Sequence, residues 1–333
     1  MKRVFYSACH HDGAVWKRSS SGGAFTAITD AWFEAHGEKA VVYGCAMDGA
    51  LQAVHIRATT AEERNAMCGS KYIGSNAAAA LKQAAADLKD GMYVCFSGTP
   101  CQIAALKSVL KALRVDSEGR LVTVEVICHG VGSTRFFGDY IANLERKYGS
   151  KAISCGFRGK SRPGKKQDMH VTFANGRVYH APSTNYDWFY TAYLRNLILR
   201  PSCFHCPFAQ SRRQADIAIA DHWEQTQGQQ ARSLAFATTQ QGVDLLDRAL
   251  QTMDNRILPE EQVYQPQLRS PVAKPESYQA FWEVYLKQGY MAAQKWLGNN
   301  TVKGRLKTAA VTALDKSGLV PVLKKVKVRI AGG

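Results

Sequence analysis

Four cysteines of this chain stand in turns flanked by glycine, proline or aromatic residues, and they constrain its fold more than any other feature. They are Cys101 in SGTPCQ, Cys128 in ICHG, and Cys203 and Cys206 in RPSCFHC. Thiolates gathered from separate loops are the ligands of an iron–sulfur cluster or of a structural zinc ion. If these cysteines share a ligand, the fold must bring distant loops to one place.

The spacing of these cysteines leaves more than one ligand open. Zinc ribbons commonly use two local cysteine pairs, whereas Cys203 and Cys206 form the one such pair here. Thiolates scattered over loops at strand ends fit a 4Fe–4S cluster better than a zinc ion. From spacing alone, a cluster, a zinc ion and the absence of any metal all remain open. Cys155 also ends a strand-like run before a loop, so it is an alternative ligand to Cys128.

The cysteine count and the N-terminus favour a cytoplasmic protein. Nine cysteines are many for 333 residues, and in a reducing compartment clustered cysteines act as ligands or reactive thiols. Polar residues interrupt MKRVFYSACHHDG too early for a signal peptide, and no apolar run is long enough to span a bilayer. Cys45 and Cys95 lie in apolar strand-like runs, which predicts plain buried thiols.

The chain carries a formal net charge of +16, which limits the kind of partner it favours. A strongly basic protein suits nucleic acid, an anionic membrane or an acidic protein. Residues 303–333 contain eight basic residues against the single acidic residue Asp315. We therefore expect a basic C-terminal tail over 301–333, with peripheral contact to an anionic membrane as one role. Nucleic acid is the less favoured partner, because the charge is not interleaved with aromatic residues.

Apolar runs separated by glycine and proline predict an alternating α/β layout. We expect a mixed sheet with flanking helices in one compact catalytic unit over 1–300, with a subdivision near residue 90 left open. Asn175-Gly176 between two alternating runs predicts a β-hairpin. The predicted strands cover 39–47, 92–97, 120–126 and 216–223, and the predicted helices cover 76–91, 100–113, 187–199 and 277–297, with another opening near Gln240.

The segment SGTPCQIAALKSVL has the pattern of a strand, a tight turn and a helix. Thr99 is suited to cap the helix, and Pro100 suits its first position because no N–H donor is needed there. Cys101 then falls in the first turn, near free amides at the positive end of the helix dipole, which favour an anionic cluster or a phosphate. The alternative is a capped core helix that carries a buried cysteine.

Two segments rich in glycine and serine show a similar pattern. In RSSSGGAFTAI, serines and the Gly22-Gly23 pair precede a predicted helix, whose free amides are able to cradle a pyrophosphate. In MCGSKYIGS, Lys71 could meet a phosphate or an electron-rich ring, with an exposed lysine as the alternative.

Polar residues near the cysteines are further candidates. His129, next to Cys128, is a candidate proton donor, with a structural role as the alternative. Asp216 and Asp221 bracket a short apolar strand after the cysteine pair. They could hydrogen-bond a cofactor, hold the cysteine loop or cap the strand ends.

Taken together and in order, these segments resemble the beta-subunit family of coenzyme F420-reducing hydrogenase and related dehydrogenases. The resemblance rests on SSSGGAFTAI, GSKYIGS, FSGTPCQIAAL, ICHGV, FRGK, NLILRPSCFHCPFA and ADIAIADHW, which span about residues 18–224. So many segments in one order are hard to obtain by chance. The resemblance implies an FAD-containing, iron–sulfur oxidoreductase, in which electrons pass between a 4Fe–4S cluster and a flavin that exchanges a hydride with the substrate.

The resemblance also implies the residues of the site. The flavin site would be lined by Ser20, Ser21, Gly22, Gly23, Ser70, Lys71 and Tyr72, with Ser97, Gly98, Thr99 and Pro100 near its phosphates or its ring. The cluster ligands would be Cys101, Cys128, Cys203 and Cys206. Lys71 would stabilise an anionic reduced flavin, so Lys71 and His129 are the residues expected to act in catalysis.

Departures from the family pattern leave the substrate unassigned. FRGK, CHGVG and ADHWE stand where FRDK, CHGVP and ADFWG are expected. We also expect a stand-alone form that lacks an N-terminal ferredoxin-like module. Electrons would then come from a separate acidic carrier such as ferredoxin or flavodoxin, which the basic charge would steer. Two other classes remain open, a zinc-stapled nucleic-acid-binding protein and a non-catalytic interaction subunit of the same fold.

Overall fold

The computed structural model of the chain describes residues 3–160, 168–181, 187–223 and 231–298, together with Leu306 and Ala310. The basic tail expected over 301–333 therefore lies almost wholly outside the described residues. None of the described helices is both long enough and apolar enough to cross a membrane. The chain divides into two compact units, each built from separate stretches of sequence.

We call these the sheet unit and the hairpin unit. The sheet unit comprises Met1–Val131 and Arg200–Val272, and the hairpin unit comprises Gly132–Leu199 and Ala273–Gly333. The sequence predicts one compact unit over 1–300 with a subdivision near residue 90 left open, and the two units divide at residues 131/132, 199/200 and 272/273. Residue 90 falls inside the sheet unit, because strands on either side of it pair with each other.

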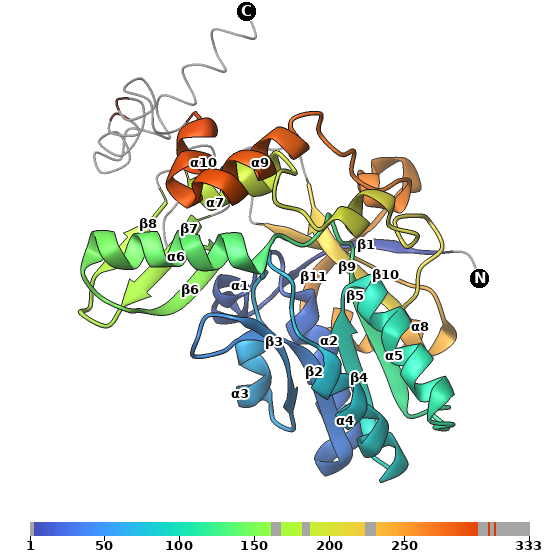
Figure 1. Ribbon diagram of the computed structural model, residues 1–333. Helices are drawn as coiled ribbons and strands as arrows, with labels where there is room; N and C mark the ends of the chain where they lie inside the picture. Colours follow the sequence, from blue (N-terminus) through green and yellow to red (C-terminus); the bar gives the residue numbers. More distant parts are fainter. Residues whose placement is uncertain are drawn as a thin grey trace, which may run out of the picture. The chain divides into compact units, whose positions relative to one another are not determined.

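The sheet unit is built on an eight-stranded sheet with the strand order β11-β1-β10-β9-β5-β4-β2-β3 (Figure 1). Its strands are β1 (Phe5–His10), β2 (Ala40–Met47), β3 (Ala53–Ala58), β4 (Tyr93–Gly98), β5 (Leu121–Val126), β9 (Ile217–His222), β10 (Arg232–Ala237) and β11 (Met253–Leu258). The adjacent strands β2, β4, β5 and β9 are parallel, and the others join antiparallel. The predicted α/β fold with a mixed sheet is thereby confirmed.

Helices cover both faces of this sheet, as Figure 1 shows. The helices α2 (Ala24–His36) and α8 (Gln240–Leu250) pack on one face, and α4 (Ala78–Lys89) and α5 (Pro100–Ala112) pack on the other. Successive side chains of β2 point to opposite faces of the sheet. Val42 therefore packs in the hydrophobic core under α2 and α8, and Val41 packs in the core under α4 and α5. The shorter elements are α1 (Gly13–Arg18), α3 (Ala61–Arg64) and 3-10 turns at Gly37–Lys39, Asn65–Met67, Pro201–His205, Glu260–Gln262 and Pro266–Leu268.

The hairpin unit combines a three-stranded antiparallel sheet with helices. Its described elements are α6 (Thr134–Tyr148), β6 (Ala152–Gly159), β7 (Asp168–Phe173), β8 (Val178–His180), α7 (Trp188–Leu194), α9 (Tyr278–Gln288) and α10 (Tyr290–Trp296). The hairpin predicted at Asn175-Gly176 is confirmed, since β7 and β8 pair across it and Gly176 has a φ of 79°. Asp187 is buried and accepts hydrogen bonds from the hydroxyls of Tyr140 and Tyr179, each 2.8 Å long.

Two predicted helices are shorter than expected because the backbone turns within them. The helix expected over 277–297 is two helices, α9 and α10, and Gly289 between them has a φ of 82°. The helix expected over 187–199 ends at Leu194, since Asn196 turns the chain with a φ of 58°.

Gly22 is expected to tolerate no side chain. A Cβ atom there would lie 2.1 Å from the carbonyl oxygen of Ala8 in β1 and 2.5 Å from the amide nitrogen of Ser233 in β10. Because both contacts are to backbone, Gly22→Ala should lower the free energy of unfolding by about 3 kcal/mol, measured by chemical denaturation.

Gly13→Ala is the matched control, because no atom lies within 4 Å of the corresponding Cβ position. It should leave the free energy of unfolding nearly unchanged. Equal stability of the two variants would show that β1 and β10 do not approach Gly22 this closely.

Candidate functional site

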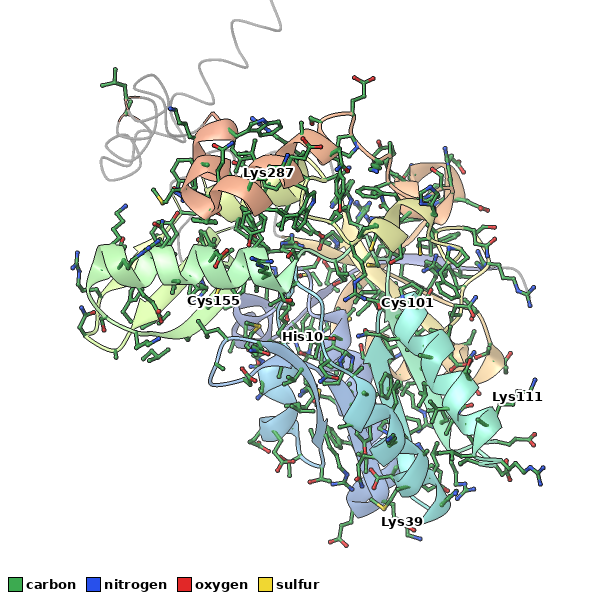
Figure 2. All side chains as sticks on the ribbon, viewed as in Figure 1. His10, Lys39, Cys101, Lys111, Cys155 and Lys287 are labelled. Carbon is green, nitrogen blue, oxygen red and sulfur yellow. The ribbon has the colours of Figure 1, made fainter. Side chains whose placement is uncertain are left out.

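The four cysteines singled out in the sequence all belong to the sheet unit. Cys101 lies in the first turn of α5, where Figure 2 labels it, and Cys128 lies in the loop after β5. Cys203 lies in the 3-10 turn Pro201–His205, and Cys206 follows that turn. Because β4 and β5 are parallel neighbours, Cys101 and Cys128 follow strand ends at the same edge of the sheet.

The other thiols lie close enough to Cys128 and Cys203 to affect the protonation of these two cysteines. Burial, together with the thiols of Cys203, Cys101 and Cys206, raises the pKa of Cys128 to about 12. The pKa of Cys203 is also raised, first by burial and then by the thiols of Cys206 and Cys101. The sheet unit therefore brings thiols from three separate segments into one neighbourhood.

Nearby groups oppose this rise and favour the charged thiolates. A backbone hydrogen bond from Gly130 lowers the pKa of Cys128. A backbone hydrogen bond from Val131 and the guanidinium of Arg200 both lower the pKa of Cys203. Gly130 has a φ of 146°, a conformation that residues with a side chain rarely adopt. Donors of this kind are the groups that orient and tune metal-bound thiolates.

The arrangement of the described side chains is not that of a single-ion site. In the part of the chain that the structure describes, no three or more His, Cys, Asp or Glu side chains form a group that could hold one metal ion. A four-iron cluster makes a different demand, because each of its thiolates binds a different iron atom. Four neighbouring thiols that do not converge on one point are compatible with such a donor set.

A buried ion pair fixes the loop after the cysteine pair. Arg213 and Glu125 are both buried, and Nε of the arginine donates to the carboxylate. Nη1 of Arg213 also donates to the carbonyl oxygens of Phe208 (3.1 Å) and Gln210 (2.9 Å). Glu125 lies on β5, shortly before Cys128. The pair therefore holds the loop against the strand that leads to the second thiol.

Asp216 holds the start of β9. Its carboxylate accepts hydrogen bonds from the backbone N–H of Thr123 (2.8 Å) and from the hydroxyl of the same residue (2.6 Å). It also accepts from the hydroxyl of Thr239 (2.8 Å). Of the roles that the sequence left open for Asp216, these contacts support that of fixing a strand end.

The two segments rich in serine and glycine meet in the structure. The amide of Ser70 donates to Oγ of Ser20 at 2.6 Å, and the hydroxyl of Ser70 donates to the same oxygen at 2.9 Å. The hydroxyl of Ser21 donates to the carbonyl oxygen of Arg232. Tyr72 is half-buried on the same loop as Ser70. The loop before α2 and the loop around residue 70 thus share one neighbourhood.

The two glycines of the first segment have different backbone requirements. Gly22 packs against β1 and β10, and its amide donates to Oγ of Ser233 at 2.9 Å. Gly23 is the residue that precedes α2, with a φ of 97°. Position 22 therefore requires glycine because two strands pack against it, and position 23 favours glycine because the chain turns into the helix with a positive φ.

Lys71 is half-buried rather than exposed. Its Nζ donates to the carbonyl oxygens of Met67 (2.8 Å) and Cys68 (2.9 Å). Burial lowers the pKa of Lys71 to about 8, and the thiols of Cys45 and Cys68 act in the opposite direction. Cys45, predicted to be a plain buried thiol, is half-buried beside this lysine, whereas Cys95 is fully buried in the core.

His55 on β3 lies next to the predicted flavin residue Ser97, and sequence reasoning missed it. Its Nε2 lies 3.1 Å from the carbonyl oxygen of Ser97, and its Nδ1 lies 3.0 Å from Oγ of Ser75. Burial lowers the pKa of His55 to about 4, so the ring is neutral at physiological pH. In the sequence, AVHIRA shows only the alternation of a strand, which does not distinguish this histidine from any other strand residue.

The end of β4 and the start of α5 hold the remaining predicted flavin residues, Ser97, Gly98, Thr99 and Pro100. Thr99 caps α5 in a capping box with Gln102, and Pro100 occupies the first turn, as predicted. Oε1 of Gln102 accepts from the amide (2.9 Å) and from the hydroxyl (3.1 Å) of Thr99. Nε2 of Gln102 donates to Oγ of Ser75 at 2.8 Å, which connects this turn to His55.

The sequence also makes His129 and Cys155 candidates. His129 is half-buried on the loop that carries Cys128. Cys155 lies on β6 in the hairpin unit, where its Sγ is 3.6 Å from Sδ of Met169. Burial raises the pKa of Cys155, and the carboxylate of Asp187 raises it further. Of the two alternative ligands, Cys128 is the one whose thiol interacts with the other three cysteines.

Arg213→Met should destabilise the sheet unit strongly. The substitution leaves the carboxylate of Glu125 buried without its counter-charge, which costs about 3–5 kcal/mol in the free energy of unfolding. Burial already raises the pKa of Glu125, and loss of the arginine should raise it further. The variant should therefore regain stability as the pH falls and Glu125 becomes protonated, which denaturant titrations at several pH values would measure.

Adding Glu125→Gln to Arg213→Met should recover most of the lost stability, because no buried charge then remains. Lys151→Met is the surface control, since Lys151 is 83% exposed in its ion pair with Glu145 and should contribute about 0.5 kcal/mol or less. A stability loss in Arg213→Met that does not depend on pH would contradict this account.

Comparison with known proteins identifies the family of the chain. The family model for the C terminus of the beta subunit of coenzyme F420 hydrogenase/dehydrogenase matches residues 91–261, just over half of the sequence. The chain is similar in fold to a chain of the F420-reducing nickel–iron hydrogenase complex from Methanosarcina barkeri, with a TM-score of 0.53 and 20% sequence identity over 89% of this chain and 90% of that one. No curated protein matches it. The chain belongs to the coenzyme F420 hydrogenase/dehydrogenase beta-subunit family of oxidoreductases.

Proposed function

We propose that this chain is an iron–sulfur flavoprotein oxidoreductase that passes electrons between an external one-electron carrier and a hydride-accepting substrate. The observation that carries the proposal is that the thiols of Cys101, Cys203 and Cys206 act electrostatically on Cys128, although the four cysteines come from three segments of the sheet unit. The same unit holds the paired loops of Ser20 and Ser70. A site for a one-electron centre and a site for a two-electron cofactor would thus lie in one compact unit.

The proposed cluster ligands are Cys101, Cys128, Cys203 and Cys206. The donor set fits a 4Fe–4S cluster, because four thiolates are its usual ligands and backbone hydrogen bonds already point to two of these sulfurs. Such a cluster accepts and releases electrons one at a time. The ion pair of Arg213 with Glu125 would hold the loop that carries Cys203 and Cys206 in place when these cysteines bind iron.

The proposed FAD site comprises Ser20, Ser21, Gly22, Gly23, Ser70, Lys71, Tyr72, Ser97, Gly98, Thr99 and Pro100. Bound FAD would exchange a hydride with the substrate and single electrons with the cluster. The ammonium of Lys71 would stabilise negative charge on the ring, and His129 would donate a proton.

Arg200 connects the two proposed sites. A Cβ atom on Gly74, in the loop of Ser70, would lie 2.9 Å from Nη2 of Arg200. The guanidinium of Arg200 also lowers the pKa of Cys203. One side chain therefore touches the proposed flavin loop and acts on a proposed cluster ligand.

The net charge supports an acidic electron carrier as partner. A chain with a net charge of +16 attracts proteins such as ferredoxin or flavodoxin over long range, and association should slow as salt is added. The class of substrate is left open, because the departures from the family pattern fall in FRGK, CHGVG and ADHWE. Contact of the basic tail with an anionic membrane stays a secondary proposal.

Anaerobically purified protein should show flavin absorption bands over a broad cluster shoulder. Iron analysis of the same sample should give about four irons per chain, since one 4Fe–4S cluster is proposed. A colourless protein that contains zinc and no flavin, even after reconstitution, would contradict the proposal and favour the zinc-stapled binding protein.

Cys203→Ala should lose most of the bound iron, because it removes one of the four proposed ligands. Cys95→Ala is the matched control, since Cys95 is fully buried in the core away from the proposed ligand set and should leave the iron content unchanged. Full iron content and full activity in Cys203→Ala would remove the cluster assignment.

Lys71→Met should abolish a pH-dependent step in the flavin potential. Lys71 carries its charge below a pKa of about 8 and loses it as the pH rises through that value. The charge favours the anionic reduced flavin, so the midpoint potential of the wild-type protein should fall more steeply with pH across this region than that of the variant. Spectroelectrochemical titration of the bound flavin would measure both curves.

Lys39→Met is the control for a general effect of charge, because Lys39 is exposed at the end of the 3-10 turn after α2. Its titration curve should match that of the wild-type protein. Identical curves for Lys71→Met and the wild-type protein would place Lys71 away from the flavin.

A further inference from the structure

A chain of hydrogen bonds runs from the buried His55 to the thiol of Cys101. It passes through Ser75, Gln102 and Thr99, and every link is between 2.8 and 3.1 Å. These residues come from β3, from the loop before α4 and from the first turn of α5. The capping box alone accounts for the contact between Thr99 and Gln102, but it does not account for the links on either side of it.

The direction of each hydrogen bond follows from the chemistry of its partners. The carbonyl oxygen of Ser97 can only accept, so Nε2 of His55 carries the proton and Nδ1 accepts. Ser75 must therefore donate its hydroxyl proton to Nδ1 of His55. With its proton committed, Oγ of Ser75 accepts from Nε2 of Gln102 at 2.8 Å.

The amide of Gln102 is thereby held in one orientation. Its Nε2 faces Ser75, so its Oε1 faces Thr99 and accepts from both the backbone amide and the hydroxyl of that residue. A reversed amide would place Nε2 against the backbone N–H of Thr99, with two donors facing each other. His55 is 8% exposed, so water has little access to the bonds that the ring makes with Ser97 and Ser75.

The hydroxyl of Thr99 stands between two acceptors. Oγ1 lies 3.1 Å from Oε1 of Gln102 and 3.1 Å from Sγ of Cys101. When Cys101 is a thiol, its own proton can point to Thr99 while the hydroxyl of Thr99 donates to Gln102. When Cys101 is a thiolate, both Gln102 and Cys101 are acceptors, and they compete for one hydroxyl proton.

We propose that Gln102, held in orientation by Ser75 and His55, controls how strongly the hydroxyl of Thr99 hydrogen-bonds to the sulfur of Cys101, and thereby sets the reduction potential of the proposed cluster. The inference rests on the proposed function, because it takes Cys101 to be a cluster ligand. Thr99 and Gln102 are positioning residues in this account. Neither has to move a proton onto or off the substrate.

The direction of the effect follows from charge. Reduction adds an electron to the cluster, and a hydrogen bond to a ligand sulfur stabilises the added negative charge. A stronger bond from Thr99 therefore raises the potential, and its loss lowers the potential. Gln102 acts in the opposite sense, because it draws the same hydroxyl proton away from the sulfur.

Thr99→Val and Gln102→Met are the variants that test the proposal. Thr99→Val removes the hydroxyl and should shift the midpoint potential of the cluster to a more negative value. Gln102→Met removes the competing acceptor at nearly the same volume, leaving the sulfur as the acceptor for Thr99, and should shift the potential to a more positive value. A redox titration followed by electron paramagnetic resonance of the reduced cluster measures both shifts without any substrate.

Ser75→Ala tests the remote part of the chain. It leaves the contacts between Gln102 and Thr99 in place and cuts the link to His55. With its amide less firmly held, Gln102 should compete less well, so the potential should shift in the positive direction by less than in Gln102→Met.

Two controls separate this role from helix capping. Thr239→Val removes a matched threonine that caps α8 and donates to Asp216, and it should leave the potential unchanged. Thr99→Ser keeps the hydroxyl, so the midpoint potential of its cluster should equal that of the wild-type protein. If Thr99→Val fails to fold, Gln102→Met and Thr99→Ser still decide the outcome.

The possible failures can be told apart. A wild-type protein without iron would overturn the proposed function and this inference with it. Normal iron content with unchanged potentials, or shifts of the same sign in Thr99→Val and Gln102→Met, would overturn this inference alone.

Discussion

The parallel pairing of β4, β5 and β9 is the constraint on which the candidate site depends. In this register Gly98 at the end of β4 lies opposite Glu125 near the end of β5. Cys101 and Cys128 follow these two residues at equal distances along the chain, so both thiols leave the sheet at the same edge. In an antiparallel pair the two strand ends would lie at opposite edges. Parallel pairing is therefore what allows these two thiols to meet.

Strand pairing alone does not place the cysteine pair, because its loop must still return along β5 before β9 begins. Buried polar contacts fix this return, since Glu125 binds Arg213 and accepts from the amide of Gln214 at 3.3 Å. Asp216 then bonds to Thr123 on the same strand. Displacing any of these charged partners would leave a buried charge uncompensated, so the loop is held in one arrangement. The polar residues on this face of β5 are explained by the loop that they anchor.

Local sequence signals predicted the features that neighbouring residues determine. The capping of α5 by Thr99 and the hairpin at Asn175-Gly176 both follow from residues adjacent in the chain. Local signals could not predict the two units, because each unit is built from separate stretches of the chain. In the sheet unit, β1 pairs with β10 and β11, which belong to the second stretch, Arg200–Val272. His55 was missed for the same reason. Its position becomes informative only when the fold brings it, through Ser75, to the turn that carries the first thiol.

The surroundings of Cys128 and Cys203 balance burial against charge. Burial raises the pKa of Cys128 and of Cys203, which opposes the thiolate form that a metal requires. The backbone amides of Gly130 and Val131 act against this effect, and they are fixed dipoles that need no rearrangement when charge develops. Arg200 acts in the same direction on Cys203 with a full charge. Burial limits the access of water to these two sulfurs, and these donors favour the thiolate forms that burial alone disfavours.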